Sequence, residues 1–359
     1  MVNWGDAANI TISDIMVSRE TVEYMRKAAA SNIWSILDKH SKPAMRAQLI
    51  RRDKHGKIIH GSYERISAPE VAPLPVEKSD LHTLIAFNRN EAVINEVIEI
   101  ILDIMAELEL SPAELLDKVI LFKGDYMTVR NILYDFPGSR AMDFGPRPYT
   151  NGEFIRRAAF RRQEDEPIHQ LRFVEPVIGL FHLQMCILGT IYKAHWGSEE
   201  GREPASISRF VKLLGKPGIL SPKVTDFRSY AQLFDQILDS YIIAIAAEKV
   251  KAVSEHDFHQ RLGDTNWPRL IEAIVEDIFP ADHGIARVHR MRYGSDGVEV
   301  PLVERDLPYE KFLLLCQQGL VYRDYSAAVS AGDTGRLNIF FQFGRRNYMA
   351  PLIPTIRAS

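Results

Sequence analysis

The sequence predicts an α/β protein with a large all-α portion. Two short apolar runs, at residues 118–122 and 172–181, are rich in β-branched and aromatic side chains. Runs of this kind are typical of strands that are buried on both faces, as in the centre of a mixed sheet. From residue 198 to residue 320, apolar residues recur at three- and four-residue steps, which is typical of helices. A mixed sheet with a following helical block is therefore the expected architecture.

The other elements follow in order along the chain. Residues 1 to about 40 are expected to be helical, with Ile33, Trp34 and Leu37 on one face. Pro69, Pro73 and Pro75 force an extended connector. These observations divide the chain into four regions: an N-terminal helical and extended region (1–80), the α/β core (81–197), the helical block (198–320), and a C-terminal core segment with a tail (321–359).

Composition excludes several classes of protein. The chain has 359 residues, of which 46% are hydrophobic, so it can form about two globular domains and is not disordered. A net charge of −3 excludes a wholly basic nucleic-acid binder but permits a local basic face. Two cysteines, without a signal peptide or a long apolar run, indicate an intracellular chain with no membrane partner. Composition leaves the oligomeric state open.

A polar residue follows each of the two predicted strands. Asp125 comes directly after Lys123 and Gly124, and His182 follows the second run. Side chains that follow the strands of α/β sheets often carry the chemistry of the protein. Asp125 is either a magnesium ligand, if a second carboxylate lies nearby, or a cap of the next helix. His182 is either a metal or substrate contact, or a buried histidine that is bonded to a carbonyl group.

A cluster of arginines lies between the two strands. Arg156, Arg157, Arg161 and Arg162 cover one broad face at helical spacing, which could meet the phosphates of a nucleic acid. The acidic residues 164–166 follow at once, so self-paired surface charge is the alternative. The chain contains no Walker loop, dinucleotide fingerprint, nucleophile elbow or zincin motif.

Several motifs together resemble a known family. Residues 124–128 match GDxxT, residues 176–185 match PxxGLFHLQM, and residues 323–325, 332–336 and 347–348 match RDY, GDxGR and NY. This order is similar to that of a large family of uncharacterised domains that is abundant in fungi and associated with transposable elements. The resemblance spans most of residues 80–350.

The resemblance implies a transposase-derived domain. Its core would be an RNase H-like mixed sheet with a helical insertion, and its ancestral activity would be magnesium-dependent cleavage and strand transfer of DNA. Its expected location is inside the cell, with the nucleus as one option. Asp125 corresponds to the first catalytic acid. Leu180 and Pro351 stand where relatives hold acids, so another carboxylate would have to substitute, from the following candidates: Asp333, Glu175, Asp143 and Glu248. The expected state is therefore degenerate or inactive.

Two further functions stay open. One is a non-catalytic module that binds nucleic acid or protein, with the helical block supplying the surface. The other is an α/β hydrolytic enzyme in which Asp125 and His182 form an acid–base pair. That enzyme would need a nucleophile such as Thr128 or Ser139 beside the pair.

Overall fold

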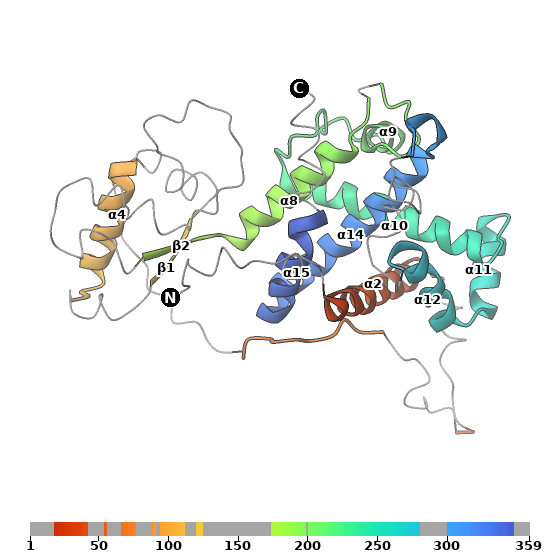
Figure 1. The fold of residues 1–359 in the computed structure, drawn as a ribbon, viewed down its shortest axis with the longest axis horizontal. Helices are drawn as coiled ribbons and strands as arrows, with labels where there is room; N and C mark the ends of the chain where they lie inside the picture. Colours follow the sequence, from red (N-terminus) through yellow and green to blue (C-terminus); the bar gives the residue numbers. More distant parts are fainter. Residues whose placement is uncertain are drawn as a thin grey trace. The chain divides into compact units, whose positions relative to one another are not determined.

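The fold is that of a computed structural model, and it is predominantly helical (Figure 1). The structure describes residues 18–41, 54–55, 66–76, 86, 88–90, 94–111, 120–124, 174–198, 200–280 and 300–347. The chain divides into two compact units. The helical unit comprises Met1–Pro75 and Met185–Ser359, and the strand unit comprises Val76–Gln184.

The described residues of the strand unit form one pair of strands and one helix that lies wholly within the unit. Helix α4 (Ile94–Glu107) buries Val97, Ile98 and Ile101, as the apolar spacing in this stretch predicts. Strands β1 (Ile120–Gly124) and β2 (Val174–Ile178) pair in parallel, with Ile120 opposite Val174 and Gly124 opposite Ile178. Helix α8 (Leu180–His195) begins one residue after β2 and continues into the helical unit.

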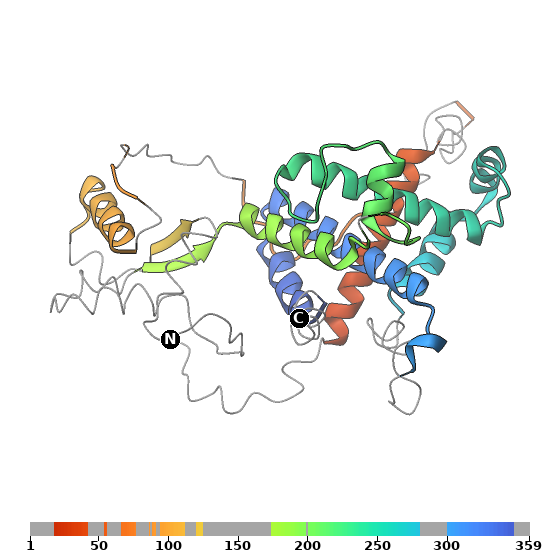
Figure 2. The same cartoon turned by 90° about the horizontal axis from the view of Figure 1, so that it is seen from above.

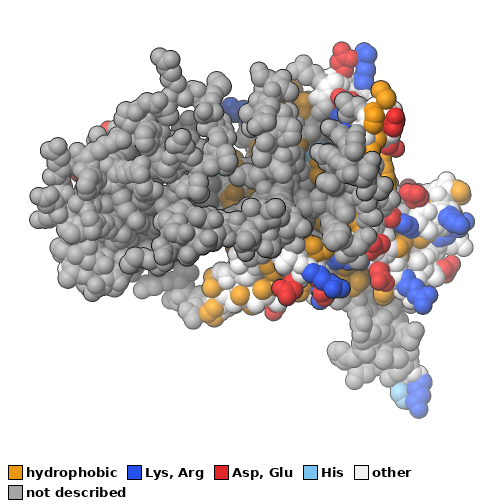
Figure 3. Space-filling view, viewed as in Figure 1, with side chains coloured by type: hydrophobic (Ala, Val, Ile, Leu, Met, Phe, Trp, Pro, Cys, Tyr) orange, Lys and Arg blue, Asp and Glu red, His pale blue; other side chains and the backbone are white. Residues whose placement is uncertain are grey.

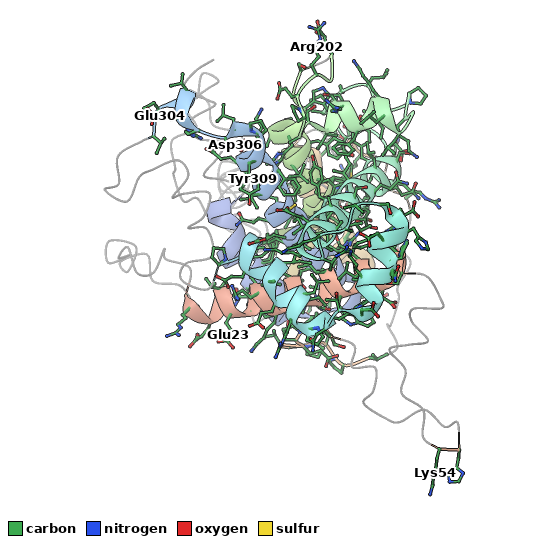
Figure 4. The ribbon with its side chains drawn as sticks, turned by 90° about the vertical axis from the view of Figure 1, so that its right-hand side faces the viewer. Glu23, Lys54, Arg202, Glu304, Asp306 and Tyr309 are labelled. Carbon is green, nitrogen blue, oxygen red and sulfur yellow. The ribbon has the colours of Figure 1, made fainter. Side chains whose placement is uncertain are left out.

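The remaining helices belong to the helical unit, and several begin at a capping side chain. They are α2 (Arg19–His40), α9 (Ile207–Leu213), α10 (Phe227–Lys249), α11 (Glu255–Asp264), α12 (Trp267–Ile278), the short 3-10 helix η2 (Leu302–Glu304), α14 (Leu307–Ala331) and α15 (Thr334–Asn347). Asp306 caps α14 by accepting from the backbone N–H of Tyr309, and Figure 4 labels both residues at the start of this helix. Among the described residues, no helix is long and apolar enough to cross a bilayer.

Helix α14 is the centre of the helical unit. Its apolar residues occupy every side of the helix, a pattern typical of a helix that is surrounded by others. It packs against α2, α10, α12 and α15, so segments from both ends of the chain meet there. Figures 1 and 2 show α2, in red, lying beside α14 and α15, in blue. Helix α12 shows the opposite pattern, because its buried side chains, from Trp267 to Ile278, form a single stripe.

The predicted mixed α/β core, with its RNase H-like sheet, is wrong. In the described part of the chain, β1 and β2 are paired only with each other, and helices make up most of the rest. Short apolar runs do not distinguish a central strand from one strand of an isolated pair. The second run also ends early, because Leu180 and the residues after it belong to α8. The large apolar core is formed by helices.

Three other expectations are confirmed. Helix α2 buries Ile33, Trp34 and Leu37 together. The described part of the proline-rich connector, residues 66–76, contains no helix. Residues 200–280 and 300–320, the described part of the predicted helical block, contain no strand.

On the described surface that Figure 3 shows, basic and acidic side chains are interspersed, with apolar ones between them.

Candidate functional site

The two predicted strands are neighbours, as the sequence indicates. Because β1 and β2 are parallel and Gly124 lies opposite Ile178, the chain leaves both strands at the same edge of the pair. Asp125 follows β1 at this edge but lies outside the described residues, as do Asp143 and the arginines at 156, 157, 161 and 162. Glu175 is the second residue of β2, opposite Leu121.

His182 lies in the first turn of α8. Its side chain is half-buried, and its ring is 5.7 Å from the ring of Phe181, in an edge-to-face arrangement. Phe181 is itself 51% exposed. Leu180, the position at which the resemblance led us to expect an acid, is the first residue of the helix. Among the described residues, no group of three or more His, Cys, Asp or Glu side chains could hold a metal ion.

The RDY and GDxGR motifs meet at a buried cluster of Tyr24, Asp324 and Arg336. The Tyr24 hydroxyl donates to Asp324 Oδ2 at 2.9 Å, and Arg336 Nε donates to the same hydroxyl at 2.9 Å. Arg336 Nη2 closes the ring with an ion pair to Asp324 Oδ1. All three residues are at most 7% exposed. Burial, together with the charge of Asp324, raises the pKa of Tyr24.

Asp333, one of the predicted substitute acids, holds backbone groups on two segments. Its Oδ1 accepts from the N–H of Ala72 at 2.9 Å and of Arg336 at 3.0 Å, and its Oδ2 accepts from the N–H of Val71 at 3.0 Å. The bond from Arg336 is a helix cap at the start of α15. Burial alone would raise the pKa of Asp333, but these donors lower it below its usual value.

The residues on either side of Asp333 also form hydrogen bonds with the connector. The N–H and hydroxyl of Thr334 both donate to the carbonyl of Ala72, at 3.1 and 3.0 Å. The N–H of Leu74 donates to the carbonyl of Gly332 at 3.0 Å. We call Gly332, Asp333 and Thr334 the connector clamp. It fixes the extended segment 71–74 to the turn between α14 and α15.

Arg323, the first residue of the RDY motif, ties three helices together. Its Nη2 lies 2.8 Å from Asp235 Oδ1 and 2.9 Å from Asp239 Oδ1, both on α10. The other oxygen of Asp239 accepts from Lys39 at 2.7 Å and lies 3.0 Å from His40 Nε2, at the end of α2. Burial would raise the pKa of Asp239, but the hydrogen bonds from Lys39 and His40 and the charge of Arg323 lower it below its usual value.

The sequence motifs identified Arg323, Asp324, Asp333 and Arg336 as residues of interest, but they did not predict which residues these side chains contact. Tyr24 lies 300 positions from Asp324, and no local pattern in the sequence connects the two. Glu248, another candidate acid, is exposed on α10. Outside the motifs, residues 204–225 contain four basic residues and no acid, a pattern that is visible in the sequence.

Comparison with known proteins places the chain in a family. No curated protein and no solved structure matches the chain. The predicted membership of an uncharacterised family is confirmed, whereas the link to transposable elements stays a prediction. The model of DUF6589, described as a family of unknown function, matches residues 7–134 and 150–356, and the chain belongs to this family.

Proposed function

We propose that this chain works by binding, as a non-catalytic helical module that presents a fixed surface to a macromolecular partner. One observation carries the proposal: the charged residues of the RDY and GDxGR motifs bind other parts of the fold. Arg323 joins α14 to α10, Asp324 and Arg336 join α14 to α15, and Asp333 holds the connector.

These contacts suit a structural role. Asp324 and Arg336 are buried and paired, and removing one partner of a buried ion pair leaves an uncompensated charge. The connector clamp uses backbone groups, so it holds residues 71–74 whatever their side chains are. The motif residues thus connect α10, α14, α15 and the connector, which favours a rigid fold. A rigid surface loses less conformational entropy when it binds a partner.

The stability of a motif variant tests this proposal. In Asp324→Asn, we expect the free energy of unfolding to fall by about 3–5 kcal/mol, because the Arg336 charge stays buried without its counter-charge. Urea unfolding followed by circular dichroism measures this. The matched control is Glu23→Gln, which breaks an exposed ion pair with Lys27 on α2 (Figure 4) and is expected to change stability little.

The opposite result would contradict the proposal. Active-site residues often reduce stability, so replacing one tends to leave the folded state unchanged or more stable. If Asp324→Asn were as stable as the wild type and a catalytic activity of the chain were lost with it, the motif would belong to an active site. The DNA-cleaving and hydrolytic alternatives place their chemistry at Asp125. The Asp324→Asn variant leaves Asp125 in place, so it tests the role of the motif and not the role of Asp125.

A further inference from the structure

We infer that α9 and the loop after it form a docking surface for an acidic, amphipathic segment of a partner protein. The inference rests on the binding role proposed above. The residues of this surface are exposed leucines and the basic residues close to them in the sequence. This Leu–Lys surface consists of Arg209, Lys212, Leu213, Leu214, Lys216, Leu220 and Lys223.

The apolar part of the surface is unusually exposed. Leu213, Leu214 and Leu220 are 67%, 45% and 84% exposed, within a stretch of eight residues. A single exposed leucine is ordinary on a protein surface, but a local group of them marks an interaction site more often. Burying these side chains in a partner would remove their apolar area from water.

The charged part of the surface has one sign. Between Glu203 and Asp226 the chain carries four basic residues and no acid, although its net charge is −3. None of the four forms an ion pair with an acid in the part of the chain that the structure describes. Arg202, 83% exposed and paired with Glu200, points outward at the edge of this region (Figure 4). Complementarity therefore calls for acidic groups on the partner.

Buried side chains and hydrogen bonds fix the backbone of the Leu–Lys surface. Ile207, just before the surface, and Ile219, within it, are both buried, and the Tyr230 hydroxyl donates to the carbonyl of Ser221 at 3.0 Å. Helix α9 ends at Leu213, and Gly215, just past its C-cap, has a left-handed φ of 58° that suits glycine. The N–H of Lys216 then donates to the carbonyl of Val211 at 2.9 Å. The exposed leucines thus project from a fixed loop.

Two other partners suit the surface less well. Phosphates of a nucleic acid would bind the lysines but leave the three leucines in water. Residues 211–226 contain no aromatic residue, whereas loops and helices that enter the membrane interface commonly use tryptophan or phenylalanine. A protein segment with leucines on one face and carboxylates beside them matches both kinds of side chain, in the manner of a helix that binds through its apolar face.

A designed peptide can test the inference on the full-length chain. The probe is a fluorescein-labelled helical peptide of about 18 residues, or five turns, with leucines on one face and glutamates on the other. Fluorescence anisotropy is expected to show saturable binding at micromolar concentration. Two comparison peptides, one with serine for leucine and one with lysine for glutamate, are expected not to bind.

Variants of the chain then locate the site. Leu213→Ser combined with Leu220→Ser, and Lys212→Glu combined with Lys216→Glu, are each expected to weaken peptide binding by at least about tenfold. Val253→Ser and Arg269→Glu change an exposed valine and an exposed arginine elsewhere and are expected to leave the affinity unchanged. Thermal unfolding of each variant checks that it folds.

Other outcomes overturn the inference. Duplex DNA and vesicles of phosphatidylcholine with phosphatidylserine serve as parallel probes. If either binds through the Leu–Lys surface and the peptide does not, the surface serves nucleic acid or membrane. If no probe binds, the docking surface is refuted. In both cases the structural role of the motifs is unaffected, because the stability of Asp324→Asn measures it separately.

Discussion

At the scale of single residues, His195 illustrates how burial sets chemistry in this fold. The side chain is 2% exposed, and its Nε2 lies 2.9 Å from Gln318 Oε1 on α14. Burial disfavours the charged imidazolium and lowers the pKa of His195 to about 4, although the bond to Gln318 opposes this. The histidine is therefore neutral in the folded protein near neutral pH.

His195 makes stability depend on pH. Since the unfolded chain protonates this histidine near about pH 6.5, it binds more protons than the folded chain between about pH 6.5 and 4. The free energy of unfolding is expected to fall as the pH falls through this window, by up to about 1.4 kcal/mol per pH unit. Urea unfolding at a series of pH values should show a shallower slope for His195→Gln.

The control for this prediction is His256→Gln, which changes an exposed histidine on α11. The comparison uses the slope, so a lower overall stability of His195→Gln does not affect it. Equal slopes for the wild type and His195→Gln would show that His195 is not the source of the pH dependence. Asp239 and Asp333, whose pKa values are lowered, lose their contribution as the pH falls from the usual pKa of aspartate through their own lowered values, so most of their effect lies at lower pH than that of His195.

At the scale of elements, the contact between α15 and the connector depends on close approach. A Cβ atom added at Gly335 would lie 2.5 Å from Val71 Cγ1 and 2.9 Å from the backbone nitrogen of Ala72. The backbone nitrogen cannot move aside like the end of a long side chain. Glycine at this position therefore lets the first turn of α15 lie against residues 71–72.

Gly335→Ala is expected to displace the connector from the clamp. Alanine favours a helix by about 1 kcal/mol over glycine, so α15 itself should not be weakened. The amides of Val71, Ala72 and Leu74 should exchange with deuterium faster, because their acceptors in the clamp are lost. Hydrogen exchange followed by mass spectrometry measures this.

Gly218→Ala provides the matched control, since an added Cβ there meets nothing within 4 Å. In Gly218→Ala, the backbone amides of residues 71–74 should exchange with deuterium at the wild-type rate. Unchanged protection of residues 71–74 in Gly335→Ala would mean that α15 and the connector can separate slightly without breaking the clamp.

At the scale of the whole molecule, the helical unit is assembled from distant parts of the sequence. Helix α2 lies near the N-terminus, yet it packs against α14 and α15. Its end supplies Lys39 and His40 to Asp239 on α10. The chain leaves this unit at residue 75 and re-enters it at residue 185, so the strand unit is an insertion between two parts of the helical unit.

The predicted loss of nuclease activity concerns the whole chain. A site with a single carboxylate binds magnesium poorly, and in the predicted resemblance only Asp125 corresponds to a catalytic acid. The purified protein is therefore expected not to nick supercoiled plasmid in the presence of magnesium, as judged by agarose gel electrophoresis. Any binding to DNA through Arg156, Arg157, Arg161 and Arg162 should be weak and should fall with salt.

A catalytically competent DNA-cleaving enzyme would behave differently. Metal-dependent nicking that disappears in Asp125→Asn would show that another acid has taken the place of the missing ones. It would also contradict the proposed non-catalytic role. Nicking that persists in Asp125→Asn would point to a contaminating nuclease.

Local patterns in the sequence identified many of the elements. The spacing of apolar residues predicted α2, α4 and the helices of residues 200–280, because the period of a helix repeats within a few residues. Three prolines predicted the extended connector. Strands β1 and β2 were also expected, whereas their parallel direction was seen only in the structure. Helix α15 was not predicted, since its aromatic run resembled the end of a core segment.

By itself, the sequence determined where most helices lie, which faces they bury, and which motifs mark the family. Only the tertiary structure decided that, in the described part of the chain, the two strands pair only with each other and that the motif residues hold the fold together. Asp324 meets Tyr24 from 300 positions away, and Asp333 meets Val71 from 262 positions away. Such pairs have no period and no spacing rule, because they depend on how completed helices pack.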